Sequence, residues 1–325
     1  MNNQISPIYF GKLTSAGDFV RYNASGKIVQ ELDQWFQEGL YHAKIRLNPN
    51  WDLAYKKAPA YHFLFNSPPY QQSLVGVFQP SWDSVGRKYP FFAALILNHS
   101  EISVESRARL PAQYHHFISN ARFFISRLIL GETTPDEFEA SQHLESAPES
   151  GSSDNPYRNY KENTSLSEFI AQIQNYAGGE VFGNVIFNLA HLLKALKNQD
   201  IGQLTYGLRF PLGGQVTFMD YEVSFWLELI LPKLVLFKGL PFLFYRQGDL
   251  QSRPYLFVFF KSPSPKNFAV ILQPDLEIDT IYKLDHTVSS ANDSSGSETV
   301  RELLEAVHPD QPNLADFLES WNASF

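Results

Sequence analysis

The chain has 325 residues, of which 44% are hydrophobic and 18% charged, so it can form a packed core and is not disordered over most of its length. Its formal net charge of −8 argues against a general nucleic-acid or anionic-membrane binder, because such proteins present basic surfaces. The absence of cysteine excludes disulfides, thiolate zinc sites, iron–sulfur clusters and cysteine nucleophiles, and it fits a reducing compartment.

In chain order, the sequence opens with a short apolar strand and a turn-rich stretch, expected at residues 8–10 and 11–23. Apolar residues then recur at helical spacing, which predicts an amphipathic helix from Ser25, its expected cap, to Leu40. A shorter helix, three strands and a longer helix follow, expected at residues 51–57, 61–65, 74–78, 91–97 and 113–130. Proline, serine, aspartate and glycine mark residues 80–90, between the second and third strands, as a structured loop.

The chain changes character at Ser141. Residues 141–163 are rich in Ser, Glu, Pro and Asn and predict a linker or long exposed loop. Beyond it, helices are expected at residues 166–176, 185–196, 223–230 and 265–272, and strands at 204–210, 234–237, 242–245 and 255–260. Residues 289–297 predict a second polar loop, and residues 300–321 a weakly helical tail.

Interspersed strands and helices indicate an α/β or α+β protein with helices covering a sheet. A mixed β-sheet is expected, because the strands do not alternate strictly with long crossover helices and two pairs resemble hairpins. We interpret residues 1–140 as an amino-terminal domain, 141–164 as the linker, and 165–325 as a second α/β half packed against the first. No segment offers the roughly 20 apolar residues of a membrane-spanning helix, so the protein is not expected to span a membrane.

The motifs of common catalytic sites are missing, since the sequence has no GxGxxG after a strand, P-loop, HExxH or GxSxG motif. The nine histidines do not form a metal-binding set, and the adjacent His115 and His116 would point in different directions on a helix. We therefore expect no enzymatic activity, no catalytic residues, no cofactor and no metal.

Two segments, residues 11–21 and 80–90, combine glycines, a carboxylate and a cation within about a dozen residues. In a functional interpretation they recognise an anion or a protein partner. In a structural interpretation the aspartates cap turns and Arg87 pairs with a carboxylate. A Ser–Asp pair without histidine lacks the general base of a serine nucleophile, so hydrolysis is not expected. The candidate residues are Gly11, Lys12, Gly17, Asp18, Phe19, Pro80, Ser81, Trp82, Asp83, Gly86 and Arg87.

Two expectations about these candidates can be tested in a structure. Asp18, Asp83 and Arg87 should converge near one end of the sheet, with at least one Asp–Arg pair, because they lie in loops flanking strands expected to be neighbours. Trp82 should either pack in the core and hold the loop there, or be exposed and bind a partner.

The same segments resemble the TagF family of type VI secretion-associated proteins. The resemblance runs through Gly11-Lys12-Leu13, Gly17-Asp18-Phe19-Val20, Trp35, and parts of residues 51–63 and 76–90, in shared order and spacing. Beyond Ser141 it is looser and involves residues 208–212, 225–226 and 241–245. Thr14 stands where the family usually has a proline, so the geometry of that turn is expected to differ.

The resemblance implies a three-layer α/β sandwich, with helices on both faces of the sheet, in a bacterial cytoplasmic protein. It further implies a post-translational repressor that binds proteins of the secretion apparatus, including a forkhead-associated (Fha) scaffold protein, and it brings no catalytic residues. A structural or assembly factor of the same apparatus is the alternative, because either role needs an exposed apolar patch with a polar rim.

Overall fold

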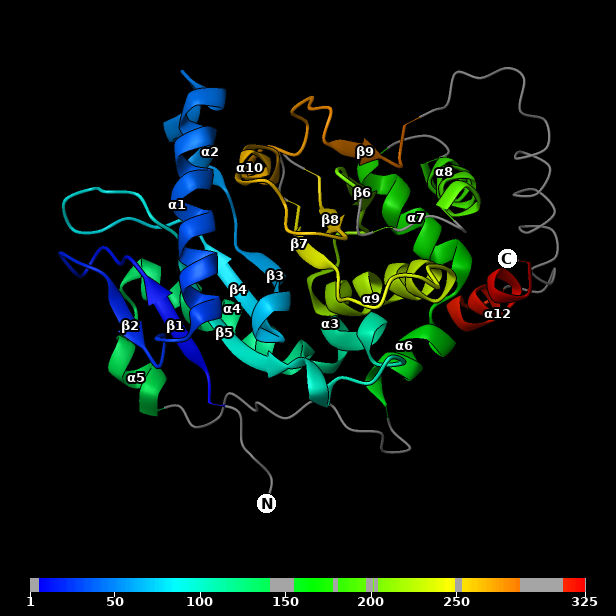
Figure 1. Cartoon of the computed structure of the whole chain (residues 1–325), viewed down its shortest axis with the longest axis horizontal. Helices are drawn as coiled ribbons and strands as arrows, with labels where there is room; N and C mark the ends of the chain where they lie inside the picture. Colours follow the sequence, from blue (N-terminus) through cyan, green and yellow to red (C-terminus); the bar gives the residue numbers. More distant parts are fainter. Residues whose placement is uncertain are drawn as a thin grey trace.

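In the part of the chain that the structure describes, nine strands form one mixed sheet at the centre of the molecule (Figure 1). The computed structural model describes residues 6–140, 155–177, 181–196, 201, 204–248, 253–286 and 312–324. The strand order is β2-β1-β5-β4-β3-β7-β8-β6-β9, with only β6 and β9 paired in parallel. The strands are β1 (Ile8–Gly11), β2 (Val20–Tyr22), β3 (Tyr61–Ser67), β4 (Gln72–Gln79), β5 (Phe91–Asn98), β6 (Gly207–Pro211), β7 (Phe242–Arg246), β8 (Tyr255–Phe259) and β9 (Ile281–Lys283).

Helices cover both faces of this sheet, so the expected three-layer α/β sandwich is confirmed. One face packs against α1 (Lys27–Leu47), α2 (Trp51–Lys57) and α10 (Phe268–Leu272). The other packs against α3 (Leu110–Gln113), α4 (His115–Leu130), α6 (Pro156–Asn163), α7 (Leu166–Ala177), α8 (Val181–Leu196), α9 (Met219–Ile230) and α12 (Leu314–Ser324). The remaining helical segments are α5 (Pro135–Ala140) and the 3-10 turns η1 (Pro68–Tyr70), η2 (His99–Glu101), η3 (Arg107–Arg109), η5 (Val216–Phe218), η6 (Leu231–Lys233) and η7 (Pro265–Asn267).

The amino- and carboxy-terminal halves interlock through the sheet and through helix α1. Strand β3 pairs antiparallel with β7, which makes the sheet continuous between the halves. The apolar stripe of α1 packs on this junction, where the Trp35 ring stacks on Phe244 of β7 with centroids 5.0 Å apart. The Trp35 indole N–H donates to the carbonyl of Pro263 at 2.9 Å, which satisfies its buried polar atom.

The expected linker is wrong for its last part, because residues Pro156–Asn163 form helix α6. The Asn155 side chain accepts hydrogen bonds from the backbone N–H groups of Tyr157 and Arg158, and Pro156 occupies the first turn. Tyr157 and Tyr160 are buried. Burial of these two aromatic rings stabilises the helix, although the polar composition of the segment predicted an exposed loop. Residues 141–154 lie outside the described residues.

Other boundaries also differ from the expectation. Residues 234–237, predicted as a strand, form a turn after η6 in which Phe237 N–H donates to Leu234 O, leaving Val235 and Leu236 exposed. These residues favour a β-strand by their type, but no described strand lies beside them to form hydrogen bonds with one. Helix α1 is preceded by Gly26 rather than by Ser25 and lacks a side-chain cap. The predicted polar loop 289–297 and residues 300–311 of the predicted tail lie outside the described residues.

Candidate functional site

The two candidate segments meet as a pair of loops. Residues 12–19 connect β1 to β2, and residues 80–90 connect β4 to β5; we call them the paired loops. The N–H of Ser84 donates to Ala16 O at 2.9 Å, and Arg87 Nη2 donates to Gly17 O at 2.7 Å. The longer loop projects from the sheet on the side of the molecule that carries α1 (Figure 1). Segments about 70 residues apart in sequence therefore form one structural unit.

Asp83 is the centre of this unit. Its buried Oδ2 lies 2.9 Å from Lys12 Nζ and 2.7 Å from Arg87 Nε, and its Oδ1 accepts the backbone N–H of Arg87 at 2.8 Å. Burial alone would raise the pKa of this carboxyl, but the hydrogen bonds and charges of Lys12 and Arg87 hold the pKa well below its usual range. The expected Asp–Arg pair is confirmed, and the contacts of Asp83 match the structural interpretation.

Asp18 lies beside this pair but does not join it. Its side chain is exposed, and Oδ1 accepts the N–H of the next residue, Phe19, at 2.8 Å. The expected convergence therefore holds only for Asp83 and Arg87. Lys12, which the sequence placed among the candidates without a partner, supplies the second charged contact instead. Its ammonium also lies 5.1 Å from the centroid of the Phe19 ring.

Other residues of the longer loop attach it to α2. The Tyr55 hydroxyl of α2 donates to Ser81 O at 3.0 Å and accepts from Ser81 N–H at 3.2 Å. Pro80 is buried beside them. Trp82 is half-buried, pairs with Lys88 in an isolated antiparallel bridge, and belongs to neither core cluster of the described chain. It therefore does not plug the core.

Gly11 is required by a close approach of two backbones. Its φ is +146°, and a Cβ at this position would lie 2.3 Å from Pro90 O and 2.5 Å from Phe91 Cα. Gly86 also has a positive φ, +88°, but space is open around it.

We expect Gly11→Ala to lower the free energy of unfolding by about 2–3 kcal/mol. The alanine would have a strained φ, and its Cβ would clash with the backbone of Pro90 and Phe91. Gly86→Ala is the matched control and should cost only about 1 kcal/mol, from its φ alone. Urea unfolding of both variants measures the difference. Equal losses would contradict the close approach of β1 to the loop.

A pocket opens next to the paired loops. Its volume is about 330 Å³, and it is lined by α1, α2 and the longer loop; we call it the α1–α2 pocket. The lining residues are Leu40, Tyr41, Lys44, Trp51, Gly86 and Lys88. Of these, sequence analysis selected only Gly86, because Tyr41 and Lys44 look like the ordinary solvent face of an amphipathic helix.

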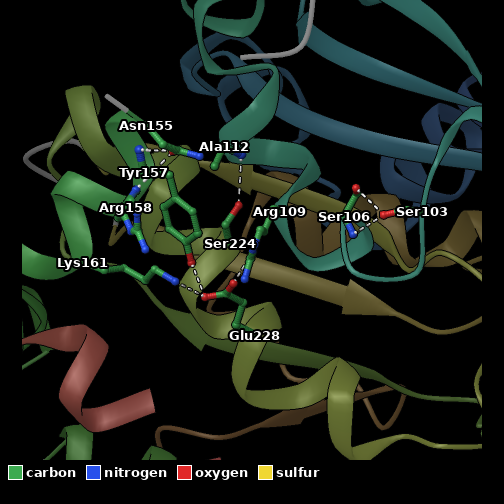
Figure 2. A network of polar contacts seen from close by, with 10 residues as sticks. All are labelled: Ser103, Ser106, Arg109, Ala112, Asn155, Tyr157, Arg158, Lys161, Ser224 and Glu228. Atoms are coloured by element: carbon green, nitrogen blue, oxygen red, sulfur yellow. Dashed lines mark hydrogen bonds and ion pairs between the residues drawn. The ribbon is translucent and has the colours of Figure 1, made fainter. Parts of the chain in front are cut away.

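Sequence analysis also missed the three buried carboxylates of α9, of which Asp220 and Glu228 bind side chains of other elements. Glu228 accepts hydrogen bonds from Arg109, Tyr157 and Lys161 and so joins η3 and α6 to α9 (Figure 2). Asp220 is bonded to His62 Nδ1 at 2.8 Å, to His115 Nδ1 at 2.7 Å and to the Tyr245 hydroxyl at 2.8 Å.

Asp220 connects the two halves where β3 meets β7, whereas Glu228 connects α9 to η3 and α6. Asp220 is fully buried and lines none of the pockets described above or below, so we assign its cluster to the packing of the halves against each other. Glu228, by contrast, lines a pocket of about 230 Å³ together with Arg109 and Lys161, and these ion pairs hold the elements around that pocket together.

Within the described ranges, no group of three or more His, Asp or Glu side chains could hold a metal ion. No helix among the same residues has the length and apolarity needed to cross a membrane.

Comparison with known families now bears on these features. The family model for the TagF N-terminal domain, described as type VI secretion system-associated, matches residues 8–144. This part of the chain, less than half of its length, is therefore similar to the TagF N-terminal domain. The matched part of the TagF N-terminal domain holds the paired loops and all six lining residues of the α1–α2 pocket.

A solved structure, PA0076 from Pseudomonas aeruginosa PAO1, is similar to this chain with a TM-score of 0.49 and 16% sequence identity. The similarity covers 85% of this chain and 98% of that one. No curated protein matches the sequence.

Proposed function

We propose that this protein is a cytoplasmic, post-translational repressor of a type VI secretion system that binds one component of the apparatus. The single observation behind this proposal is the match of residues 8–144 to the TagF N-terminal domain. A forkhead-associated scaffold protein is our candidate partner. Repression by binding removes a component from assembly in proportion to the amount of repressor present.

The local chemistry supports a binding role rather than catalysis. Ser81 and Ser84 flank buried Asp83 in the longer loop, and no histidine lies in either loop. The Ser81 hydroxyl is buried and has no hydrogen-bond partner within the described structure. A serine nucleophile needs a base within hydrogen-bond reach. Lys12 and Arg87 are engaged with Asp83, and these contacts fix the longer loop.

Deleting the gene in its native host tests the direction of the effect. A repressor's loss raises the amount of substrate protein secreted into the medium. The loss of a structural or assembly factor, the alternative function, abolishes secretion. Complementation with the wild-type gene is the control, because it must restore the original level in either case.

A further inference from the structure

We propose that the α1–α2 pocket binds an acidic segment of a partner protein, with an apolar side chain of that segment seated between Tyr41 and Trp51. The proposal rests on the proposed function only in that the protein acts through protein contacts. It adds the place of contact and the chemistry of the bound segment.

The apolar part of the pocket comes from three side chains of α1 and α2. Leu40 is half-buried and Trp51 is 8% exposed, so they form the floor, whereas Tyr41 is 65% exposed and stands at the margin. Ile45, one helical turn beyond Tyr41 on the same face of α1, is 61% exposed. Val85, next to the lining residue Gly86, is 72% exposed. Exposed aromatic and aliphatic side chains around a concave floor are typical of a protein-binding site.

The charged part of the pocket is basic. Lys88 forms an ion pair with Asp52 of α2 at 2.5 Å. The hydrogen bond and charge of Lys88, with smaller contributions from the charges of Lys56 and Lys44, lower the pKa of the Asp52 carboxyl. Lys44 and Lys88 line the pocket, and Asp52 pairs with only one of them, so the pocket keeps a local excess of positive charge on a chain whose net charge is −8. An acidic partner complements this excess, and charge complementarity across an interface gives specificity.

The wall of the pocket is fixed before any partner arrives. Gly86 N–H donates to Asp83 O, and Asp83 is held by Lys12 and Arg87. Tyr55 fastens the start of the same loop to α2. A preformed wall reduces the ordering entropy that binding must overcome. This explains how the buried candidate residues serve binding without touching a partner: they position the pocket wall.

A protein segment fits this site better than a nucleic acid or a membrane does. The pocket volume of about 330 Å³ accommodates a few side chains. The three lysines lie next to an aspartate and a small apolar floor rather than along an extended basic stripe, and nucleic-acid sites depend on many phosphate contacts.

The test measures binding of two labelled peptides to the purified full-length protein by fluorescence anisotropy. Both are short and carry one central phenylalanine; one has glutamates around it and the other has lysines. We expect the acidic peptide to bind about tenfold more tightly than the basic one, with an affinity that falls as salt is added. Lys44→Glu and Tyr41→Ala should each weaken acidic-peptide binding about tenfold, with little change in the melting temperature, since both side chains are exposed.

Lys27→Glu, at the other end of α1, is the matched control and should leave binding unchanged. Equal binding of the two peptides, no binding of either, or an equal loss in Lys27→Glu would overturn the proposal. Secretion assays separate it from the proposed function. If deletion raises secretion and the Lys44→Glu and Tyr41→Ala proteins still restore repression, the repressor role stands and the pocket proposal fails. If deletion does not raise secretion, the repressor role fails, whereas the peptide result is unaffected.

Discussion

Asp220→Ala is expected to lower the free energy of unfolding by about 3–5 kcal/mol, the range for breaking a buried charge pair. The carboxylate accepts hydrogen bonds from His62 of β3, His115 of α4 and Tyr245 of β7. Its removal therefore deletes one hydrogen bond from each of these three buried or partly buried side chains. Urea unfolding measures the loss. Asp275→Ala, an exposed aspartate, is the matched control and should change stability by no more than about 0.5 kcal/mol.

The pH dependence of this difference has a definite sign. Burial would raise the pKa of Asp220, but the charges and hydrogen bonds of His62 and His115 outweigh burial and hold the pKa below its ordinary value of 3.8. A carboxyl whose folded pKa is depressed stabilises the fold above its unfolded pKa and loses that contribution as pH falls. The gap between wild type and Asp220→Ala should therefore shrink below about pH 4. A gap that widens on acidification would contradict an ionised Asp220.

Glu228→Ala is expected to lower the free energy of unfolding by about 3 kcal/mol, at the low end for a buried pair. The Lys161 side chain is only 15% exposed and would lose its carboxylate, whereas that of Arg109 is 51% exposed and can be rehydrated. Burial would raise the pKa of Glu228, but Lys161 and Arg109 lower it, so the group is ionised at neutral pH. The loss should appear in urea unfolding at pH 7.

The control for Glu228 lies on α6, the helix that contributes Lys161 and Tyr157 to the network in Figure 2. Glu162 pairs with Arg158 on the surface, and both side chains are more than half exposed. Glu162→Ala should change stability by about 0.5 kcal/mol or less, as for other exposed helix pairs. If Glu228→Ala and Glu162→Ala have the same effect, Glu228 does not hold α6 and η3 to α9.

Patterns of neighbouring residues in the sequence predicted those helices, strands and loops whose structure depends mainly on nearby residues. The recurrence of Leu32, Trp35 and Phe36 at helical spacing predicted α1, and its stripe is buried. The density of turn residues in residues 80–90 predicted a structured loop with an Asp–Arg pair, and Asp83 and Arg87 are four residues apart. The mixed sheet followed from hairpin-like pairs such as β3 and β4.

Contacts between distant parts of the chain could not be predicted in this way. Asp220 meets His62 across 158 residues and His115 across 105, so no local pattern brings them together. Helix α6 was missed because its polar composition conceals Tyr157 and Tyr160, whose burial depends on tertiary packing. The α1–α2 pocket was missed for the same reason, since its residues come from three elements that become neighbours only in the fold.

Repression by binding predicts a stoichiometric response when the protein is titrated in its host. Its amount is raised stepwise from an inducible promoter while secreted substrate and the abundance of apparatus components are measured. We expect secretion to fall in proportion to the protein added and to stop when its amount matches that of its partner, while the abundance of the apparatus components stays unchanged. Secretion that rises with the protein, or that stops when the protein is far scarcer than every component, would contradict repression by stoichiometric binding.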